Sequence, residues 1–295
     1  MAELRRIEAV PRLPRRPQDS HKGLYGSVLV VAGCRGMAGA AALVGASALR
    51  SGAGLVRVAC PAEVQPTVAT FEPSYMTYPL PCDADGLIDF HAALGGLERC
   101  LVGVDVLAIG PGLGQSESLR NLLLWVVRDI RLPTVIDADG LNNLKGQDDA
   151  FTSLRRPVIL TPHPGEFARL LGMTTKEVQA NREALAVEFA RTRNLVLVLK
   201  GSGTIVTDGE RLYVNPTGNP GMATGGAGDS LTGVIAALLG QRLDPFEAAQ
   251  LGTYVHGLAG DIARDQSGEV GMIAGDIVDA LPDAFYHLGA SETAD

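Results

Sequence analysis

The feature of this sequence that most constrains its fold is a repeated order of a short apolar segment, a turn, and then a helical pattern. Six short apolar segments are candidate strands, and helical patterns follow several of them: Ser27–Ala32, Leu55–Ala59, Val104–Ile109, Thr134–Asp137, Val158–Thr161 and Leu195–Leu199. Short runs of this kind are typical of strands that are buried on both faces of a parallel sheet. Strands that alternate with helices predict the α/β class.

Helical patterns separate several of these strands and also fill the last third of the chain. Thr174 and Glu177 have the spacing of a capping box, which predicts the first turn of a long helix that ends near Arg193. Apolar residues recur on one face of the other patterns. The remaining predicted helices are Gly39–Arg50, about Glu117 to Asp129, Asp229–Leu239, Pro245 to about Asp265, and Ile273–Tyr286.

The dipeptide Asp208-Gly209 lies between two further apolar segments, Thr204–Thr207 and Leu212–Val214. Asp-Gly between two strands is a strong signal for a hairpin, so we expect an antiparallel edge beside the parallel strands. The sequence contains no internal repeat and no low-complexity linker. We therefore expect one domain over residues 21–288, preceded by an exposed arm at 1–20 and followed by a tail at 289–295.

The composition excludes several kinds of partner. Of the 295 residues 46% are hydrophobic, and 25 Lys and Arg against 33 Asp and Glu give a net charge of -8. Such acidity disfavours attraction to a nucleic-acid backbone. No uncharged apolar run reaches the ~18 residues of a membrane-spanning helix, and the arginine-rich N-terminus lacks the apolar core of a secretory signal. We expect a soluble, cytoplasmic protein with no nucleic-acid or membrane partner.

Glycine is the most unusual component of the sequence, and one glycine-rich stretch runs from Asn215 to Ser230. The backbone N–H groups of Gly226, Ala227 and Gly228 lie where an apolar helix begins, which is a favourable place for phosphate. Asp229 would lie in the first helical turn. Its carboxylate could simply cap the helix, but a cap does not need so much glycine. The stretch therefore favours a site for phosphate transfer.

A second glycine-rich segment follows the strand that ends at Leu199, and it reads Lys200, Gly201, Ser202, Gly203, Thr204. One interpretation is an ordinary tight connection to the next strand. The other is a nucleotide site, in which the glycines allow close approach and the lysine and hydroxyl side chains contact phosphate. The spacing is not that of a Walker A loop. Two such loops at one sheet edge favour the nucleotide site.

Together these loops resemble the ribokinase-like superfamily, and further motifs narrow the resemblance to the ADP/ATP-dependent NAD(P)H-hydrate dehydratases. The motifs follow one another in order from about His21 to Phe285. They are H-K-G-x-Y-G at His21–Gly26, A-G at Ala32–Gly33 with M-A-G-A-A at Met37–Ala41, G-P-G-L-G at Gly110–Gly114, D-A-D-G-L-N at Asp137–Asn142, T-P-H-P-G-E at Thr161–Glu166, N-P-T-G-N at Asn215–Asn219 and G-G-A-G-D at Gly225–Asp229.

This resemblance implies a three-layer α/β/α sandwich with a mostly parallel central sheet and an antiparallel edge. It implies repair of the (6S)-hydrates of NADH and NADPH, with ADP or ATP as the co-substrate and Mg²⁺ as the cofactor. It also implies a homotetramer. Only about twenty residues precede His21, too few for a domain, so we expect the epimerase activity of many relatives on a separate chain.

The resemblance also assigns roles to individual residues. Asp229 is the base that deprotonates the C6 hydroxyl of the hydrate, and Gly226, Ala227 and Gly228 form the anion hole. The hydrate is expected to contact Ala40, Ala41, Gly112, His163 and Asp229, and the nucleotide to contact Lys200, Gly201, Ser202, Gly203, Thr204 and Gly228.

Some residues keep two interpretations. Asp137, Asp139, Asn142 and Glu166 could orient magnesium or water, but caps and turn bonds explain them nearly as well, so the metal ligands stay open. His256 lies on an apolar helix and is interpreted as packing.

Two other functions are compatible with the glycine loops. A kinase of the same superfamily could phosphorylate a small alcohol such as a hydroxymethylpyrimidine. A nucleotide sensor without catalytic activity would keep the loops but should lack a base, and Asp229 argues against it.

Overall fold

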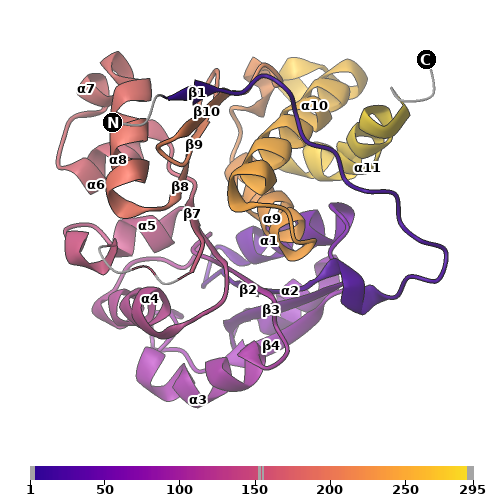
Figure 1. Ribbon diagram of the computed structural model, residues 1–295. Helices are drawn as coiled ribbons and strands as arrows, with labels where there is room; N and C mark the ends of the chain where they lie inside the picture. Colours follow the sequence, from indigo (N-terminus) through magenta and orange to yellow (C-terminus); the bar gives the residue numbers. More distant parts are fainter. Residues whose placement is uncertain (1–3, 152–153, 155, 291–295) are drawn as a thin grey trace.

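A computed structural model describes residues 4–151, 154 and 156–290, and the strands in these residues form one ten-stranded sheet. The strands are β1 (Arg5–Arg6), β2 (Ser27–Val31), β3 (Leu55–Pro61), β4 (Met76–Leu80), β5 (Val106–Ile109), β6 (Thr134–Ile136), β7 (Val158–Leu160), β8 (Val196–Leu199), β9 (Ile205–Thr207) and β10 (Arg211–Val214). Their order across the sheet is β1-β10-β9-β8-β7-β6-β5-β2-β3-β4 (Figure 1).

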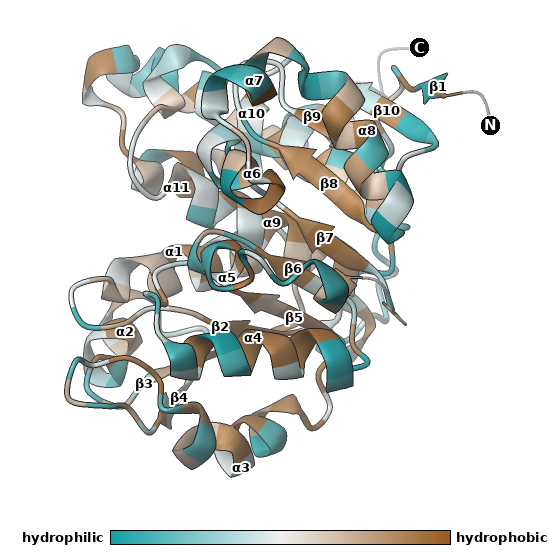
Figure 2. Cartoon of the chain, turned by 90° about the vertical axis from the view of Figure 1, so that its left-hand side faces the viewer, coloured by the Kyte–Doolittle hydropathy of each residue, from teal (hydrophilic) through white to brown (hydrophobic). Residues whose placement is uncertain are grey.

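The sheet is mixed, as the sequence predicted. All neighbours from β8 to β4 in this order are parallel, whereas β9 runs antiparallel to both β8 and β10. Every residue of β2, β5, β6, β7 and β8 is buried, because helices cover both faces of the central strands. Figure 2 shows these strands as uniformly hydrophobic.

One face of the sheet is covered by helices from the start and the end of the chain. These are α1 (Ala38–Arg50), α2 (Gln65–Phe71), α9 (Ala227–Gly240), α10 (Pro245–Gly271) and α11 (Ala274–Ala290). Small residues on α1 and α9 allow these two helices to pack closely, and a continuous apolar cluster joins this layer to the sheet.

The opposite face is covered by helices from the middle of the chain, which lie in front of the sheet in Figure 2. These are α3 (Phe90–Leu101), α4 (Glu117–Asp129), α5 (Asp139–Asn143), α6 (Pro164–Leu171), α7 (Thr175–Ala180) and α8 (Arg182–Arg193). A second apolar cluster joins them to the sheet, which completes the predicted three-layer sandwich. No helix in the described ranges is long and apolar enough to cross a membrane.

Two local predictions need correction. The capping box at Thr174 is present, but the long helix predicted to follow it breaks at Asn181, whose φ of -136° and ψ of 34° are not helical, and α8 begins at the next residue. The predicted hairpin also forms, but its turn is longer than two residues, because the innermost paired residues are Thr207 and Leu212. The carboxylate of Asp208 accepts two backbone N–H bonds inside this turn and stabilises its wider form.

The N-terminal arm was expected to be exposed, and its arginine side chains are, but its backbone is docked. Arg5–Arg6 pairs in parallel with β10 and adds a strand that the sequence did not predict. The side-chain amide of Gln250 donates to the carbonyl oxygen of Ala9 at 2.8 Å. Three apolar side chains of the arm pack against the core: Ile7, Val10 and Leu13. Of the expected tail, residues 289–290 belong to α11, and residues 291–295 lie outside the described residues.

Candidate active site

The carboxyl ends of β2, β5, β6, β7 and β8 lie at one edge of the sheet, and each is followed by a loop that contains predicted site residues or their neighbours. The chain order reverses between β2 and β5, since β3 and β4 extend the sheet on one side and β6 to β8 on the other. Ligands of open α/β sheets bind in the crevice at such a switch point. The loops after β2 and β5 meet there, where Gly33 N donates to Pro111 O at 2.9 Å.

The structure brings together two of the residues predicted to contact the hydrate. A Cβ atom added to Gly112, whose φ is +63°, would lie 2.8 Å from the Cβ of Ala40. Only glycine therefore fits opposite Ala40, which is itself partly exposed. Ala41 differs, because its side chain is fully buried against Gly33. Its predicted contact would have to be made by its backbone.

The predicted anion loop forms the start of α9. Gly226 is the N-cap residue, with a left-handed φ of +91°, and Ala227 begins the helix. The first N–H groups of a helix have no intrahelical acceptor, and the helix dipole adds partial positive charge to them. A Cβ added to Gly228 would lie 3.2 Å from the Nζ atom of Lys200. The missing side chain thus leaves an ammonium group directly beside the loop.

Lys200 belongs to one predicted glycine loop and lies beside Gly228 of the other, and its ammonium group pairs with two carboxylates. Its Nζ atom lies 2.7 Å from Oδ1 of Asp137 and 3.9 Å from Oε2 of Glu166. The other oxygen of Asp137, Oδ2, accepts a hydrogen bond from the Thr232 hydroxyl on α9 at 2.8 Å. Burial alone would lower the pKa of Lys200, but Asp137 and Glu166 outweigh burial and raise it. Lys200 is therefore a permanent cation beside the anion loop.

Asp229 occupies the first turn of α9 and has a strongly shifted pKa. Burial, together with the negative charge of Asp137, raises the pKa of Asp229 to about 7, and Lys200 only partly opposes the shift. A carboxylate with a pKa near neutrality can take a proton from a reacting hydroxyl far better than one near 4. Shifts of this kind are typical of functional sites.

His163 is held at the same edge by the N-terminus of α6. Its Nδ1 atom accepts hydrogen bonds from the backbone N–H groups of Gly165 and Glu166 at 3.0 and 3.2 Å, and its Nε2 atom lies 3.3 Å from Oε1 of Glu166. Burial and then the charge of Lys200 lower the pKa of His163, so the ring is neutral at pH 7. The side chain is 48% exposed, which leaves part of the ring accessible beside its capping role. Its contact with the hydrate stays a prediction.

The segment from Lys200 to Thr204 is the hairpin loop between β8 and β9. Gly201 and Gly203 have φ values of +139° and +62°, which disfavour residues with a side chain. Arg182, at the first position of α8, donates to the carbonyl oxygens of Leu199, Lys200 and Ser202 at 3.2, 3.3 and 2.7 Å. No local sequence pattern indicates this support, because the arginine precedes the loop by a whole helix.

The polar residues after β6 shape the glycine loop after β5. Oδ2 of Asp139 accepts from Gly114 N at 3.0 Å, and Nδ2 of Asn143 donates to Gly114 O at 2.9 Å. Of the two interpretations that the sequence left open for Asp139, a metal ligand or a turn bond, this contact is the turn bond. Within the described ranges, no group of three or more His, Cys, Asp or Glu side chains is placed to hold a metal ion.

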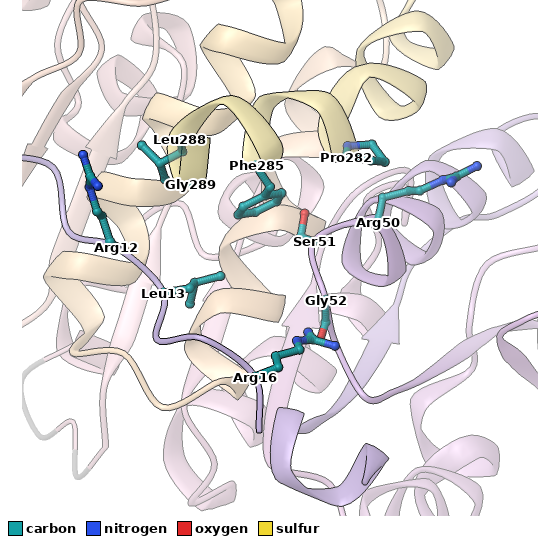
Figure 3. Close-up of a pocket in the computed structure, with 10 residues that line it drawn as sticks. All are labelled: Arg12, Leu13, Arg16, Arg50, Ser51, Gly52, Pro282, Phe285, Leu288 and Gly289. Carbon is teal, nitrogen blue, oxygen red and sulfur yellow. The ribbon is translucent and has the colours of Figure 1, made fainter. Parts of the chain in front are cut away.

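A separate cavity of about 400 Å³ lies between the N-terminal arm, the end of α1 and α11 (Figure 3). Arginine side chains surround an apolar floor that includes Leu13 and Phe285. Arg16, at its margin, donates to Gly52 O at 2.8 Å and stacks on the ring of Tyr25. The cavity is lined by residues other than the predicted site residues and is not part of the candidate active site.

Comparison with known proteins identifies the family of the chain. The family model described as NAD(P)H-hydrate dehydratase matches residues 28–283. The chain is 48% identical over 279 residues to the bifunctional NAD(P)H-hydrate repair enzyme Nnr of Moorella thermoacetica, covering 94% of this chain and 52% of that protein. It therefore spans about half the length of this and other bifunctional relatives.

Two comparisons cover nearly the whole of both chains. The ADP-dependent (S)-NAD(P)H-hydrate dehydratase of Bacillus subtilis is 36% identical over 272 residues, which are 92% of each chain. A crystal structure of the ADP/ATP-dependent NAD(P)H-hydrate dehydratase of Bacillus subtilis, co-crystallised with ATP and Mg²⁺, has a TM-score of 0.79 at 34% identity and covers 94% of each chain. On the match to the family model, the sequence identity and the shared fold, the chain belongs to the NAD(P)H-hydrate dehydratase family.

Proposed function

We propose that this chain is an ADP-dependent (S)-NAD(P)H-hydrate dehydratase. It converts the (6S)-hydrates of NADH and NADPH to the reduced cofactors and releases AMP and phosphate. The observation that carries the proposal is Asp229, a carboxylate with a pKa of about 7 in the first turn of a helix whose N-terminus adjoins the Lys200 ammonium. Family membership and the name of the Bacillus subtilis relative of similar length support the same substrates.

The two ligands occupy different halves of the site in this proposal. The hydrate lies at the switch point between β2 and β5, against Ala40, Gly112 and the exposed part of the His163 ring. The nucleotide lies on the loop from Lys200 to Thr204, with its terminal phosphate toward Gly228. Support for this arrangement comes from the proximity of Ala40 to Gly112 and of Lys200 to Gly228.

The first chemical step is transfer of the terminal phosphate of ADP to the C6 hydroxyl. Asp229 accepts the hydroxyl proton while the oxygen forms its bond to phosphorus and the bond to the AMP oxygen breaks. The N–H groups at the start of α9 and the Lys200 ammonium stabilise the negative charge on the transferring group. Asp137 and Glu166 hold Lys200 in place for this role, and Thr232 fixes Asp137.

The second step is loss of phosphate from C6. Phosphate is a much better leaving group than hydroxide, so the lone pair of the ring nitrogen can expel it with the electrons of the C–O bond. Loss of a proton from C5 then forms the C5–C6 double bond of the reduced nicotinamide. The net reaction removes water from the hydrate at the expense of one phosphoanhydride bond.

Magnesium is proposed to arrive with the nucleotide. The oxygens of Asp137 and Glu166 already have partners in Lys200, Thr232 and His163, so the residues do not form a dedicated cage. Mg²⁺ is commonly bound through one or two carboxylates together with substrate phosphates, where it neutralises phosphate charge. Asp137 and Glu166 are the carboxylates that could supply such a ligand.

We also propose that the protein acts in the cytoplasm as a homotetramer, alongside an epimerase that interconverts the two hydrate epimers. Exposed apolar side chains of Phe71 and Met76, near the free edge strand β4, support self-association. Sedimentation equilibrium would measure the assembly directly.

The decisive experiment is to incubate (6S)-hydrated NADH with the protein, ADP and Mg²⁺. We expect the absorbance of reduced nicotinamide to return, with AMP and phosphate formed in equal amounts, and ATP tested in parallel gives the nucleotide preference. If no absorbance returns while a hydroxymethylpyrimidine accumulates as a stable phosphate ester, the chain is a small-alcohol kinase and the proposal is wrong.

A further inference from the structure

Two buried polar side chains lie directly beneath the anion loop. Ser230 belongs to the first turn of α9 and is fully buried, and His256 on α10 is 7% exposed. The Ser230 hydroxyl lies 2.8 Å from the carbonyl oxygen of Ala227 and 2.9 Å from Nε2 of His256. Burying a polar group costs free energy unless the group is hydrogen-bonded, so these two side chains must satisfy each other and the backbone around them.

The position of each proton in this cluster follows from the partners. We assign the single proton of the Ser230 hydroxyl to the carbonyl oxygen of Ala227, which can only accept. With this assignment the imidazole is the donor in the contact between His256 and Ser230, which places its proton on Nε2. Burial lowers the pKa of His256 to about 4, so this ring is a neutral donor across the physiological range.

The carbonyl group of Ala227 is one end of the peptide that joins Ala227 to Gly228. A trans peptide is planar, and its C=O and N–H groups point in opposite directions. Fixing the oxygen toward Ser230 and His256 in the interior therefore aims the Gly228 N–H away from the interior. Gly228 is the loop residue that lies beside the Lys200 ammonium, so this N–H belongs to the proposed anion hole.

We propose that His256 is a positioning residue that, with Ser230, orients the Ala227–Gly228 peptide so that the Gly228 N–H faces the transferring phosphate. The inference rests on the proposed phosphoryl transfer and assigns His256 a role beyond packing. It does not make His256 an acid or base, because its donor proton stays in the cluster throughout the reaction.

Two substitutions of His256 separate donation from packing. His256→Gln keeps an N–H donor near the position of Nε2, whereas His256→Met fills a similar volume without a donor. Loss of an oxyanion-hole donor costs about 10²–10³ in kcat, and a misaligned donor should cost less. We expect His256→Met to lower kcat about tenfold to a hundredfold, with the KM for ADP changed less than about threefold, and His256→Gln to recover most of kcat.

A matched control and a pH profile distinguish this role from others. Thr253→Val alters another buried polar side chain of α10, whose hydroxyl bonds only within the helix, and it should leave kcat unchanged. The pH dependence of kcat should be the same in wild type and His256→Gln. If one limb of the profile disappears in His256→Gln, His256 acts as an acid or base and the positioning role is wrong.

An NMR measurement of the Gly228 amide tests the inference without the hydrate reaction. Labelling with ¹³C-carbonyl alanine and ¹⁵N-glycine selects Ala-Gly peptides, which include Ala227–Gly228. On titration with inorganic phosphate, the Gly228 amide signal should shift in wild type and in His256→Gln but much less in His256→Met. Wild-type protein that shows this shift yet repairs no hydrate contradicts the proposed function alone.

Other outcomes overturn the positioning role itself. These are an equal Gly228 shift in all three proteins, wild-type kcat in His256→Met, or equal losses of kcat in the Met and Gln variants. If His256→Met does not fold, Ser230→Ala leaves α10 intact and should lower kcat several-fold. Wild-type kcat and an unchanged Gly228 shift in that variant would also contradict the inference.

Discussion

Asp229 combines its proposed catalytic role with an unfavourable environment for its charge. The first turn of a helix normally stabilises a carboxylate, yet burial and Asp137 raise the pKa of Asp229 to about 7. The Lys200 ammonium lowers the pKa of Asp229, but it is already paired with Asp137. It therefore offsets only part of the unfavourable environment of the Asp229 carboxylate. The same arrangement that makes Asp229 a useful base therefore also makes it costly to ionise.

The first prediction concerns Asp229→Asn. Asparagine keeps the shape of the side chain but cannot accept the hydroxyl proton, and general-base catalysis contributes about 10²–10⁴-fold. We expect kcat to fall by about that factor, while the Kd for ADP measured by calorimetry changes little. Asp265→Asn, at an exposed position on α10, is the control and should have wild-type activity. Full activity in Asp229→Asn would remove the residue from its proposed role.

The pH dependence of the rate gives a second prediction. The base acts in its ionised form, so kcat/KM should rise with pH up to about pH 7 and level off above it. The rising limb should be absent in the residual activity of Asp229→Asn. Because ADP itself ionises near pH 6, that variant also shows how much of the profile belongs to the nucleotide. A wild-type rate that is flat between about pH 5 and 8 contradicts the assigned base.

The raised pKa of Asp229 also predicts how stability changes with pH. The folded-state pKa of about 7 lies above the unfolded value of about 3.9. Between these two values the folded protein holds a proton that the unfolded chain has lost, so this residue lowers stability as pH rises through that window. Asp229→Asn should therefore have a higher Tm than wild type at pH 8, with a smaller difference at pH 5. Equal Tm differences at both pH values would contradict the shift.

The residues of the site differ in how far the sequence could predict them. Lys200, Gly228 and Asp229 lie in local motifs whose spacing indicates anion binding, and the structure places them together. The contacts that hold these residues could not be found in this way. Asp137, which pairs with Lys200, lies 63 residues from it in the sequence, and Arg182 approaches the loop only through the fold. For His256 the sequence predicts only packing, since nothing in its own segment indicates a bond to Ser230.

At the scale of elements, α1 and α9 are the helices that position the two halves of the site. The start of α1 carries Ala40 and the start of α9 carries Asp229, so the packing of the two helices sets the distance between the proposed hydrate and nucleotide sites. One tight contact between them is at Gly233, where an added Cβ would overlap the carbonyl oxygen of Val44 and lie 2.9 Å from the Cβ of Ser47.

Gly233→Ala is therefore predicted to separate the two helices. Overpacking of a tight contact costs about 1–3 kcal/mol of unfolding free energy, which urea unfolding would measure. Gly95→Ala is the matched control, because Gly95 lies on the exposed side of α3 with only the Arg99 guanidinium nearby. That substitution should raise stability by up to about 1 kcal/mol through helix propensity. Equal effects of the two substitutions would show that the α1–α9 contact does not limit stability.

Elements with a strong local pattern were predicted best. The helix Glu117–Asp129 was predicted with the bounds that the structure shows, because Ser116 caps it and its apolar stripe is regular. The strand β4 (Met76–Leu80) was missed, because it is an edge strand with mixed burial and a proline. The break at Asn181 was missed as well, since Arg182 bonds to a distant loop and thereby outweighs local helix propensity.

At the scale of the whole molecule, the interior and one edge of the sheet serve different purposes. The switch point between β2 and β5, inside the sheet, is the proposed place of the hydrate, whereas the β10 edge is paired with the N-terminal arm through Arg5 N to Glu210 O at 2.9 Å and Ile7 N to Leu212 O at 2.8 Å. An unpaired edge strand is a template for aggregation. The arm therefore protects the sheet at a place remote from the anion loop.

Removal of residues 2–14 tests this role of the arm. Full burial of a Val, Leu or Ile side chain contributes about 1.5–3 kcal/mol, and the three apolar side chains of the arm are only partly buried, so a total loss of about 2–4 kcal/mol is expected. For a chain of this size that loss lowers Tm by about 5 °C or more. The kcat measured well below the new Tm should be unchanged, because the arm contacts β10, α10 and the turn after α1, and reaches α8 through the exposed ion pair of Arg6 with Glu183.

The double substitution Arg5→Ala and Arg6→Ala is the control for this truncation, because it removes exposed charges and the surface pair with Glu183 but keeps the backbone bonds. Exposed ion pairs contribute about 0–1 kcal/mol, so its Tm should lie close to that of wild type. If the double substitution lowers Tm as much as the truncation, charge rather than backbone pairing and apolar packing holds the arm. If the truncated protein instead keeps its Tm but forms larger assemblies, the arm protects the sheet edge without contributing to stability.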